Sequence, residues 1–181
     1  SNYVSKAAPS PVVDQSGVYA FFEGGNLLKL SHDGKPAWQR NLVEEFGPIG
    51  SRHGIGASLE HNDKSLFVWV ERSEEPYVLS VEKATGKDRW KVGGAGATSW
   101  SSPRLVPVNE TKSHIVLSAI GSLTGLDVET GQVLWTLDRI AGNSTPTPIP
   151  LGEGKFLIGA TVGRGGNDVG LRPSESNGVV E

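Results

Sequence analysis

A short pattern occurs three times in this chain and restricts the folds open to it. Segments 28–38, 80–90 and 125–135 each end in a tryptophan that follows a glycine by four residues. The pairs are Gly34 and Trp38, Gly86 and Trp90, and Gly131 and Trp135. The tryptophans are 52 and 45 residues apart, and a run typical of a β-strand precedes every glycine. A repeat of this length, made of strands, indicates one structural unit that is stacked several times.

The residue before each glycine strengthens the pattern. It is Asp33, Thr85 or Thr130, and such side chains can hydrogen-bond to the backbone of a tight turn. The spacing alone is weak, because Gly96 also lies four residues before Trp100 without that neighbour or flanking strands. We therefore expect three hairpin turns, each with its glycine at positive φ, and a structural role for the repeated glycines and tryptophans.

Further strands are expected around these hairpins. Segments 10–13, 57–59, 102–106 and 147–149 resemble first strands, and segments 17–22, 65–70, 114–118 and 155–161 resemble second strands. No helix of three turns is expected. The pattern predicts an all-β chain, a β-propeller of four-stranded antiparallel blades, with blades at about residues 9–42, 55–92 and 101–137 and an incomplete fourth at 144–181.

These blades amount to about half of a seven- to eight-bladed ring. An open arc would leave unpaired strand edges, so we expect either further sequence or a second copy of the chain to complete the ring. The chain has no methionine, even at position 1, and a removed N-terminal segment such as a signal peptide would explain this.

Composition excludes several classes of protein. A net charge of −3 provides no basic field for a phosphate backbone, so nucleic-acid binding is not expected. The absence of cysteine rules out disulfides, thiolate metal sites and a cysteine nucleophile within these 181 residues. No apolar run approaches the length of a transmembrane helix. The four histidines are scattered without metal-ligand spacing, and we expect them at the surface or in loops.

The third repeat carries a family resemblance. Segment 125–135 resembles the signature of the pyrroloquinoline-quinone (PQQ)-like β-propellers, Ala-x-Asp-x-x-Thr-Gly-x-x-x-Trp. Asp127, Thr130, Gly131 and Trp135 match this signature, and only Gly125 departs from it, because it replaces the alanine. The two earlier repeats keep fewer of these residues. The resemblance is specific for the fold and says little about function.

A broader resemblance covers most of the chain. Segments 9–22, 33–40, 53–58, 99–103 and 146–148 are similar, in this order, to the BamB-like propellers of planctomycete-type bacteria. That resemblance implies a ring of about eight blades and an exported, periplasmic or cell-surface location. It also implies a non-enzymatic scaffold or protein-binding module with no catalytic residues.

Two alternatives from other classes stay open. A PQQ-dependent dehydrogenase would need a calcium site of six to eight oxygens, and its cofactor site would lie mostly outside this chain. Asn167 and Asp168 come closest to such a ligand set, but a turn explains them better. We therefore expect no catalytic residue, no metal and no cofactor within this chain, which gives no support for PQQ or calcium but leaves both open for the rest of a ring. The other alternative is a carbohydrate-binding propeller, which exposed aromatic residues along one rim would favour.

Candidate binding residues lie on loops between blades, where scaffolds commonly carry function. Arg52 and His53 belong to the longest connection, residues 44–56, and Trp100 belongs to the later loop 93–101. An aromatic residue with arginine on neighbouring loops suits a protein partner. The competing interpretation is that Trp100 packs between blades. Two glycosylation sequons, at Asn109 and Asn143, are attributed to chance.

Overall fold

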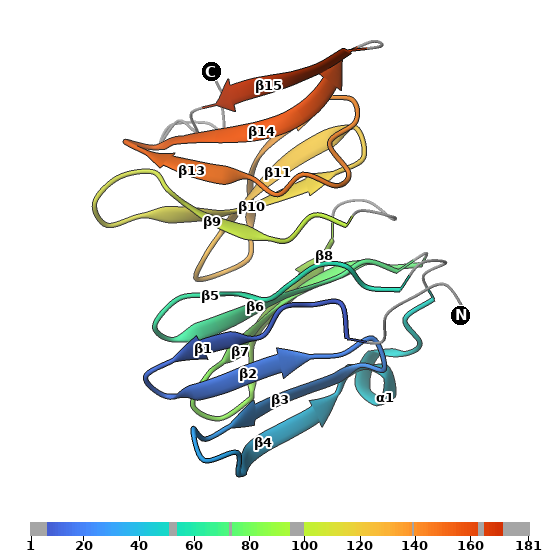
Figure 1. Ribbon diagram of the computed structural model, residues 1–181, viewed down its shortest axis with the longest axis vertical. Coiled ribbons are helices and arrows are strands. Elements are labelled where there is room, and N and C mark those ends of the chain that lie inside the picture. Colours follow the sequence, from blue (N-terminus) through green and yellow to red (C-terminus); the bar gives the residue numbers. More distant parts are fainter. Residues whose placement is uncertain are drawn as a thin grey trace. The chain divides into compact units, whose positions relative to one another are not determined.

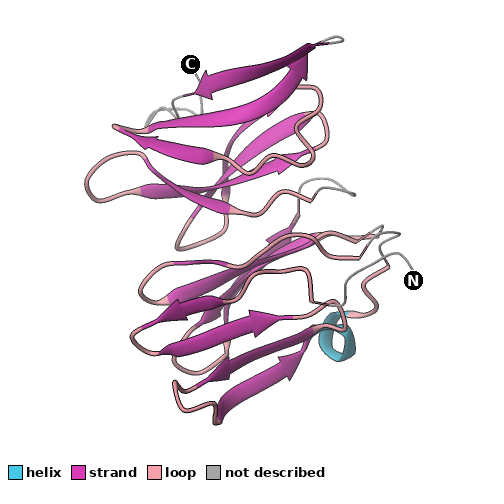
Figure 2. Cartoon of the chain, viewed as in Figure 1, coloured by secondary structure: helices cyan, strands magenta, loops and turns pink. Residues whose placement is uncertain are grey.

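The computed structural model describes residues 7–50, 54–72, 74–94, 100–138, 140–162 and 165–171. These residues form fifteen strands and one short helix, arranged in four antiparallel sheets (Figure 1). The chain divides into two compact units, residues 1–94 and 95–181, and each unit contains two of the sheets. Strand and loop account for nearly all of the described chain, as predicted (Figure 2).

Both sheets of the first unit are meanders of four consecutive strands. One consists of β1 (Val12–Asp14), β2 (Gly17–Phe21), β3 (Asn26–Leu30) and β4 (Pro36–Asn41). The other consists of β5 (Glu60–His61), β6 (Ser65–Val70), β7 (Tyr77–Glu82) and β8 (Asp88–Gly93). Every residue of β6 is buried, so this strand forms the centre of the unit's core.

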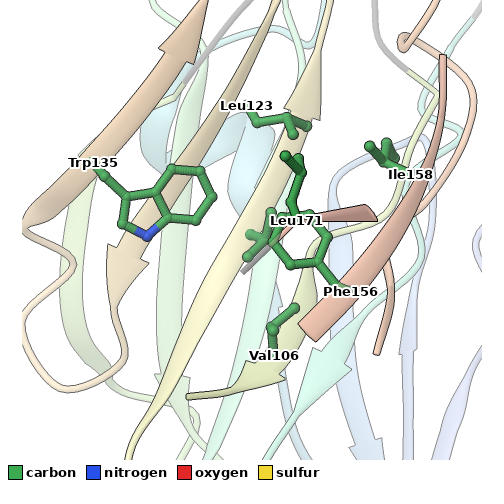
Figure 3. Packing of buried hydrophobic residues seen from close by; sticks show 7 residues of the cluster. Val106, Leu123, Trp135, Phe156, Ile158 and Leu171 are labelled. Carbon is green, nitrogen blue, oxygen red and sulfur yellow. The ribbon is translucent and has the colours of Figure 1, made fainter. Parts of the chain in front are cut away.

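The second unit repeats this topology. Its first sheet consists of β9 (Arg104–Pro107), β10 (Ser113–Ala119), β11 (Ser122–Asp127) and β12 (Val133–Asp138). Its other sheet has three described strands, β13 (Ile149–Gly152), β14 (Lys155–Val162) and β15 (Gly165–Leu171). A buried cluster joins the two sheets (Figure 3), and its members are Val106, Val116, Leu123, Trp135, Phe156, Ile158 and Leu171.

The repeated glycines occupy the turns β3–β4, β7–β8 and β11–β12. Their φ angles are 80° at Gly34, 75° at Gly86 and 72° at Gly131, in the left-handed region that the sequence predicted. In the third turn the Asp127 carboxylate accepts hydrogen bonds from the backbone N–H of Thr130 over 2.8 Å and from its hydroxyl over 2.9 Å. The repeat signature therefore encodes a hairpin held by its own side chains.

Three sequence-based expectations need correction. A helix, α1 (Leu42–Phe46), occupies the start of the expected loop 44–56, because Asn41 Oδ1 caps it by accepting from the N–H groups of Val43 and Glu44. The first strand of the second sheet lies at Glu60–His61 rather than at 57–59. Residues 167 and 168 lie in β15, paired with β14, and not in a turn.

Candidate functional site

Trp100 has a large, partly exposed aromatic side chain, and its backbone is hydrogen-bonded to a neighbouring loop. Its relative exposure is 40%. Its backbone N–H donates to the carbonyl oxygen of Ser144 over 2.7 Å, and the N–H of Ser102 donates to the hydroxyl of Thr147 over 2.9 Å. The loops that lead into β9 and β13 are thereby joined. Arg52 and His53, the other two predicted binding residues, lie outside the described residues.

Asn143 fastens this pair of loops to the β10–β11 hairpin. Its side chain is fully buried, and its amide donates to the carbonyl oxygens of Ala119 and Ser122 over 2.6 and 2.9 Å. Its Oδ1 accepts the backbone N–H of Gly121 over 3.1 Å, and its own carbonyl oxygen accepts the hydroxyl of Ser118 over 2.6 Å. Such an asparagine is a structural residue, and its burial leaves no room for a glycan.

The repeated tryptophans connect neighbouring sheets or fill the core. Trp38 of β4 donates its indole N–H to the carbonyl oxygen of Lys83 over 3.0 Å, in the turn of the next sheet. A Cβ at Gly86 would lie 2.8 Å from the indole ring, so only glycine lets the turn approach it. Arg40 closes the same junction by donating to the carbonyl oxygen of Gly86 over 2.8 Å and by pairing with Asp88. These contacts pack the β7–β8 turn against β4 and give its glycine a structural role.

Trp135 makes a different contact from Trp38. Its ring folds over Gly125, where a Cβ would come within 2.1 Å of the indole, and it stacks on Phe156 at 6.4 Å between centroids. Its indole N–H donates to Nδ1 of His114 over 3.0 Å. His114 is therefore buried within strand β10, and the expectation of surface or loop histidines is wrong at this position because the indole needs a buried acceptor.

Burial lowers the pKa of His114 below its ordinary value. The Asp127 carboxylate opposes this shift and the Lys112 ammonium adds to it. The hydrogen bond fits the same direction, because Nδ1 accepts from the indole and the imidazole is then neutral. His114 thus serves as an acceptor within the fold.

The first unit contains a groove of about 820 Å³ beside α1. It is lined by Phe46, Gly47, Pro48, Gly50, Arg72, Glu74 and Glu75. Arg72 ties its two walls together, because the guanidinium donates to the carbonyl oxygens of Phe46 and Glu75 and lies 5.2 Å from the ring centre of Tyr77. Tyr77, the ring next to Arg72, is itself buried, and this burial raises the pKa of its hydroxyl to about 12. With its guanidinium engaged in this way, Arg72 acts as a brace of the groove.

The described part of the chain has no cluster of side chains suited to a metal ion. Nowhere in it do three or more histidine, aspartate or glutamate side chains gather closely enough to hold a metal ion. The side chains at 160–169, which include Asn167 and Asp168, are outside this description. The absence of a PQQ or calcium site remains a prediction from the sequence.

Comparison with known families decides the relationship. The family model described as outer membrane protein assembly factor BamB matches residues 23–179. The chain belongs to this BamB family of PQQ-like propeller proteins. No curated protein sequence gives a significant match to it.

Solved structures share the fold of this BamB-family chain. BamB from Moraxella catarrhalis superposes with a TM-score of 0.65 at 19% identity, covering 93% of this chain and 46% of that one. Quinohemoprotein alcohol dehydrogenase ADHIIG from Pseudomonas putida HK5 gives 0.59 at 16% identity, with 87% and 28% covered. The computationally designed Ika8 protein gives 0.56 at 14% identity, with 87% and 46% covered.

These likenesses confirm the predicted all-β propeller fold. The BamB-family chain spans less than half the length of each of these structures. Its described residues include no helix with the length and apolar character needed to cross a membrane.

Proposed function

We propose that this chain is part of an exported, non-enzymatic β-propeller scaffold, located in the periplasm or at the cell surface, that binds another protein through its loops. The family match over residues 23–179 supports a scaffold of the BamB type. The observation that carries the proposal within this chain is the exposed indole of Trp100 on a loop fixed to Ser144. A large aromatic on a rigid loop is the residue type that dominates binding energy in protein interfaces.

The fixed loop matters because it lowers the cost of binding. Ordering a flexible loop at an interface costs about 0.5–1.5 kcal/mol for each immobilised side chain. Here the backbone N–H groups of Trp100 and Ser101 already share the carbonyl oxygen of Ser144, over 2.7 and 3.2 Å. This part of the backbone is therefore already held in place before a partner binds.

Trp100→Ala is the direct test of this site. Envelope proteins would be captured from the source organism on immobilised wild-type chain and on the variant, and compared by quantitative mass spectrometry. A partner that binds through Trp100 should lose about tenfold or more in affinity, as expected for an aromatic anchor. Val13→Ala is the matched control, since Val13 is 61% exposed and lies in the other unit. Equal capture by the wild type and the Trp100 variant would refute the assignment.

A PQQ-dependent oxidoreductase is the second candidate, favoured by the shared fold of quinohemoprotein alcohol dehydrogenase ADHIIG. The experiment is a titration of PQQ with calcium into the chain, followed by quenching of tryptophan fluorescence. Saturable one-to-one quenching would favour the oxidoreductase. Quenching that matches free tryptophan at the same absorbance would leave the scaffold as the better proposal.

The carbohydrate-binding alternative requires several exposed aromatic rings. Among the large hydrophobic residues that are exposed in the described part of the chain, Trp100 is the one aromatic. A single indole offers one stacking face and no extended platform. This arrangement favours an anchor for a protein partner over a sugar-binding rim.

A further inference from the structure

The first unit contains a second pocket, formed where turns of its two sheets meet (Figure 1). Its volume is about 300 Å³, which is at the small end of the range for ligand sites. Ser16 of the β1–β2 turn and Lys29 of β3 line it from one sheet. Residues 63–64, 82–84 and 89 line it from the other sheet.

Lys83 joins the two sheets at this pocket. Its side chain is only 5% exposed, and its ammonium forms an ion pair with the Asp14 carboxylate of the other sheet. The same ammonium donates to the carbonyl oxygen of Asn62 over 2.7 Å, and the backbone N–H of Lys83 donates to the carbonyl oxygen of Lys64 over 2.9 Å. The turns that form the pocket are therefore held in place without a ligand.

The pocket has an excess of positive charge. Four cationic side chains and two carboxylates line it, namely Lys29, Lys64, Lys83 and Arg89 against Asp63 and Glu82. Asp14 neutralises Lys83, which leaves three cations against two carboxylates. One of these carboxylates, Glu82, accepts the hydroxyl of Thr85 over 2.5 Å. The chain as a whole carries a net charge of −3, so the local sign is opposite to the global one.

Two of the cations have no anionic partner within the described part of the chain. The Lys29 ammonium lies 5.4 Å from the ring centre of Tyr19, and this ring is its described contact. The Lys64 side chain is exposed and forms neither a hydrogen bond nor a salt bridge with the described residues. Cations gathered around one cavity raise the local concentration of anions.

We propose that this pocket binds a small oxyanion, a carboxylate or a phosphate group, through the ammonium groups of Lys29 and Lys64. Each ammonium offers three donors to oxygen acceptors, and Arg89 adds to the positive potential. The chemistry has two possible sources, a free anion and an acidic side chain of a protein. This inference is independent of the proposed function, because the pocket and Trp100 lie in different units.

The test is isothermal titration calorimetry on the whole chain at low ionic strength, because salt screens exposed charges. The two probes are inorganic phosphate and the peptide Gly-Glu-Glu-Gly, blocked at both ends. We expect saturable one-to-one binding of at least one probe. Tighter binding of phosphate would identify a free anion as the ligand, and tighter binding of the peptide would identify the acidic side chains of a protein.

Lys29→Gln with Lys64→Gln removes both proposed ligand groups and should lower the affinity about tenfold or more. The matched control is Lys112→Gln with Lys155→Gln, which changes the net charge equally in the other unit. The control should keep the affinity within about twofold, because remote charges are screened. Circular dichroism checks the fold of both double variants.

Asp63→Asn supplies a test that loss of folding cannot imitate. It removes a carboxylate from the pocket lining and should raise the affinity for the bound probe. The proposal is overturned if neither probe binds saturably to the wild type, if the pocket and control variants bind equally well, or if Asp63→Asn weakens binding. Trp100→Ala should leave anion binding unchanged, so the two sites succeed or fail separately.

Discussion

Replacing Asn143 by alanine should destabilise the second unit strongly. The asparagine side chain is fully buried and serves three backbone groups at once, the N–H of Gly121 and the carbonyl oxygens of Ala119 and Ser122. Alanine can replace none of these contacts. The three backbone groups would then lose this hydrogen-bond partner in a site that excludes solvent in the folded chain.

The expected loss follows from these contacts. A net hydrogen bond contributes about 1 kcal/mol, and a buried group that loses its partner costs about 1–3 kcal/mol. Partial relaxation of the β10–β11 hairpin offsets some of this cost, so we expect the free energy of unfolding to fall by about 2–4 kcal/mol. Asn143→Asp should be at least as harmful at neutral pH, because a carboxylate oxygen would then face two carbonyl oxygens.

The assay is equilibrium unfolding in urea, followed by circular dichroism and tryptophan fluorescence. Asn109→Ala is the matched control, since Asn109 also heads an Asn-x-Thr triplet and accepts from Thr111 and Lys112, but in an exposed turn. Water can replace those bonds, and the cost should be about 1 kcal/mol or less. Equal losses for the two variants, or a loss below about 1 kcal/mol at Asn143, would refute the reasoning.

Two further predictions concern the contacts of Trp135. Gly125→Ala places a methyl group against the indole and should lower the free energy of unfolding in urea by about 1–3 kcal/mol. Gly93→Ala is the control and should lower it less, because there is open space around Gly93. Equal losses for the two variants would contradict the packing. Because folding lowers the pKa of His114, the unfolded chain binds its proton more readily, and stability should decline as the pH falls below the ordinary value of 6.5. His114→Gln should remove part of this decline between about pH 7.5 and about pH 5.5, and an unchanged pH profile would speak against a buried neutral imidazole.

The turns could be predicted from sequence because their cause is local. A glycine at positive φ beside a hydrogen-bonding Asp or Thr determines its own geometry, and Gly34, Gly86 and Gly131 all adopt it. α1 also had a local signal, an asparagine cap at Asn41 with Glu44 three residues later, which a search for long helices passes over.

Other features depend on contacts between distant segments. β15 is rich in glycine and has no alternating pattern, and it forms a strand because it pairs with β14 from Phe156 to Val162. The predicted site is known only at Trp100, since Arg52 and His53 fall outside the described residues. The structural importance of Asn143 had no signal beyond a sequon, because its partners lie 21 or more residues away.

The departure of the third repeat from the family signature has a spatial cause. The signature places alanine where this chain has Gly125, and the indole of Trp135 lies directly over that position. The missing methyl group lets the ring reach Nδ1 of His114 within its own sheet, whereas Trp38 reaches a carbonyl oxygen of the next sheet. The glycine at position 125 thus goes together with a contact of the repeat tryptophan inside its own sheet, in place of a contact with the next sheet.

The attachment of the Trp100 loop is made by main-chain atoms. The backbone N–H of Trp100 donates to the carbonyl oxygen of Ser144, and this bond does not depend on the side chain at position 100. The neighbouring Asn143 holds the Ser144 loop to the β10–β11 hairpin. A substitution at position 100 should therefore leave this backbone hydrogen bond intact. Under the proposed function, the residue that contacts the partner can therefore vary while the backbone that presents it stays in place.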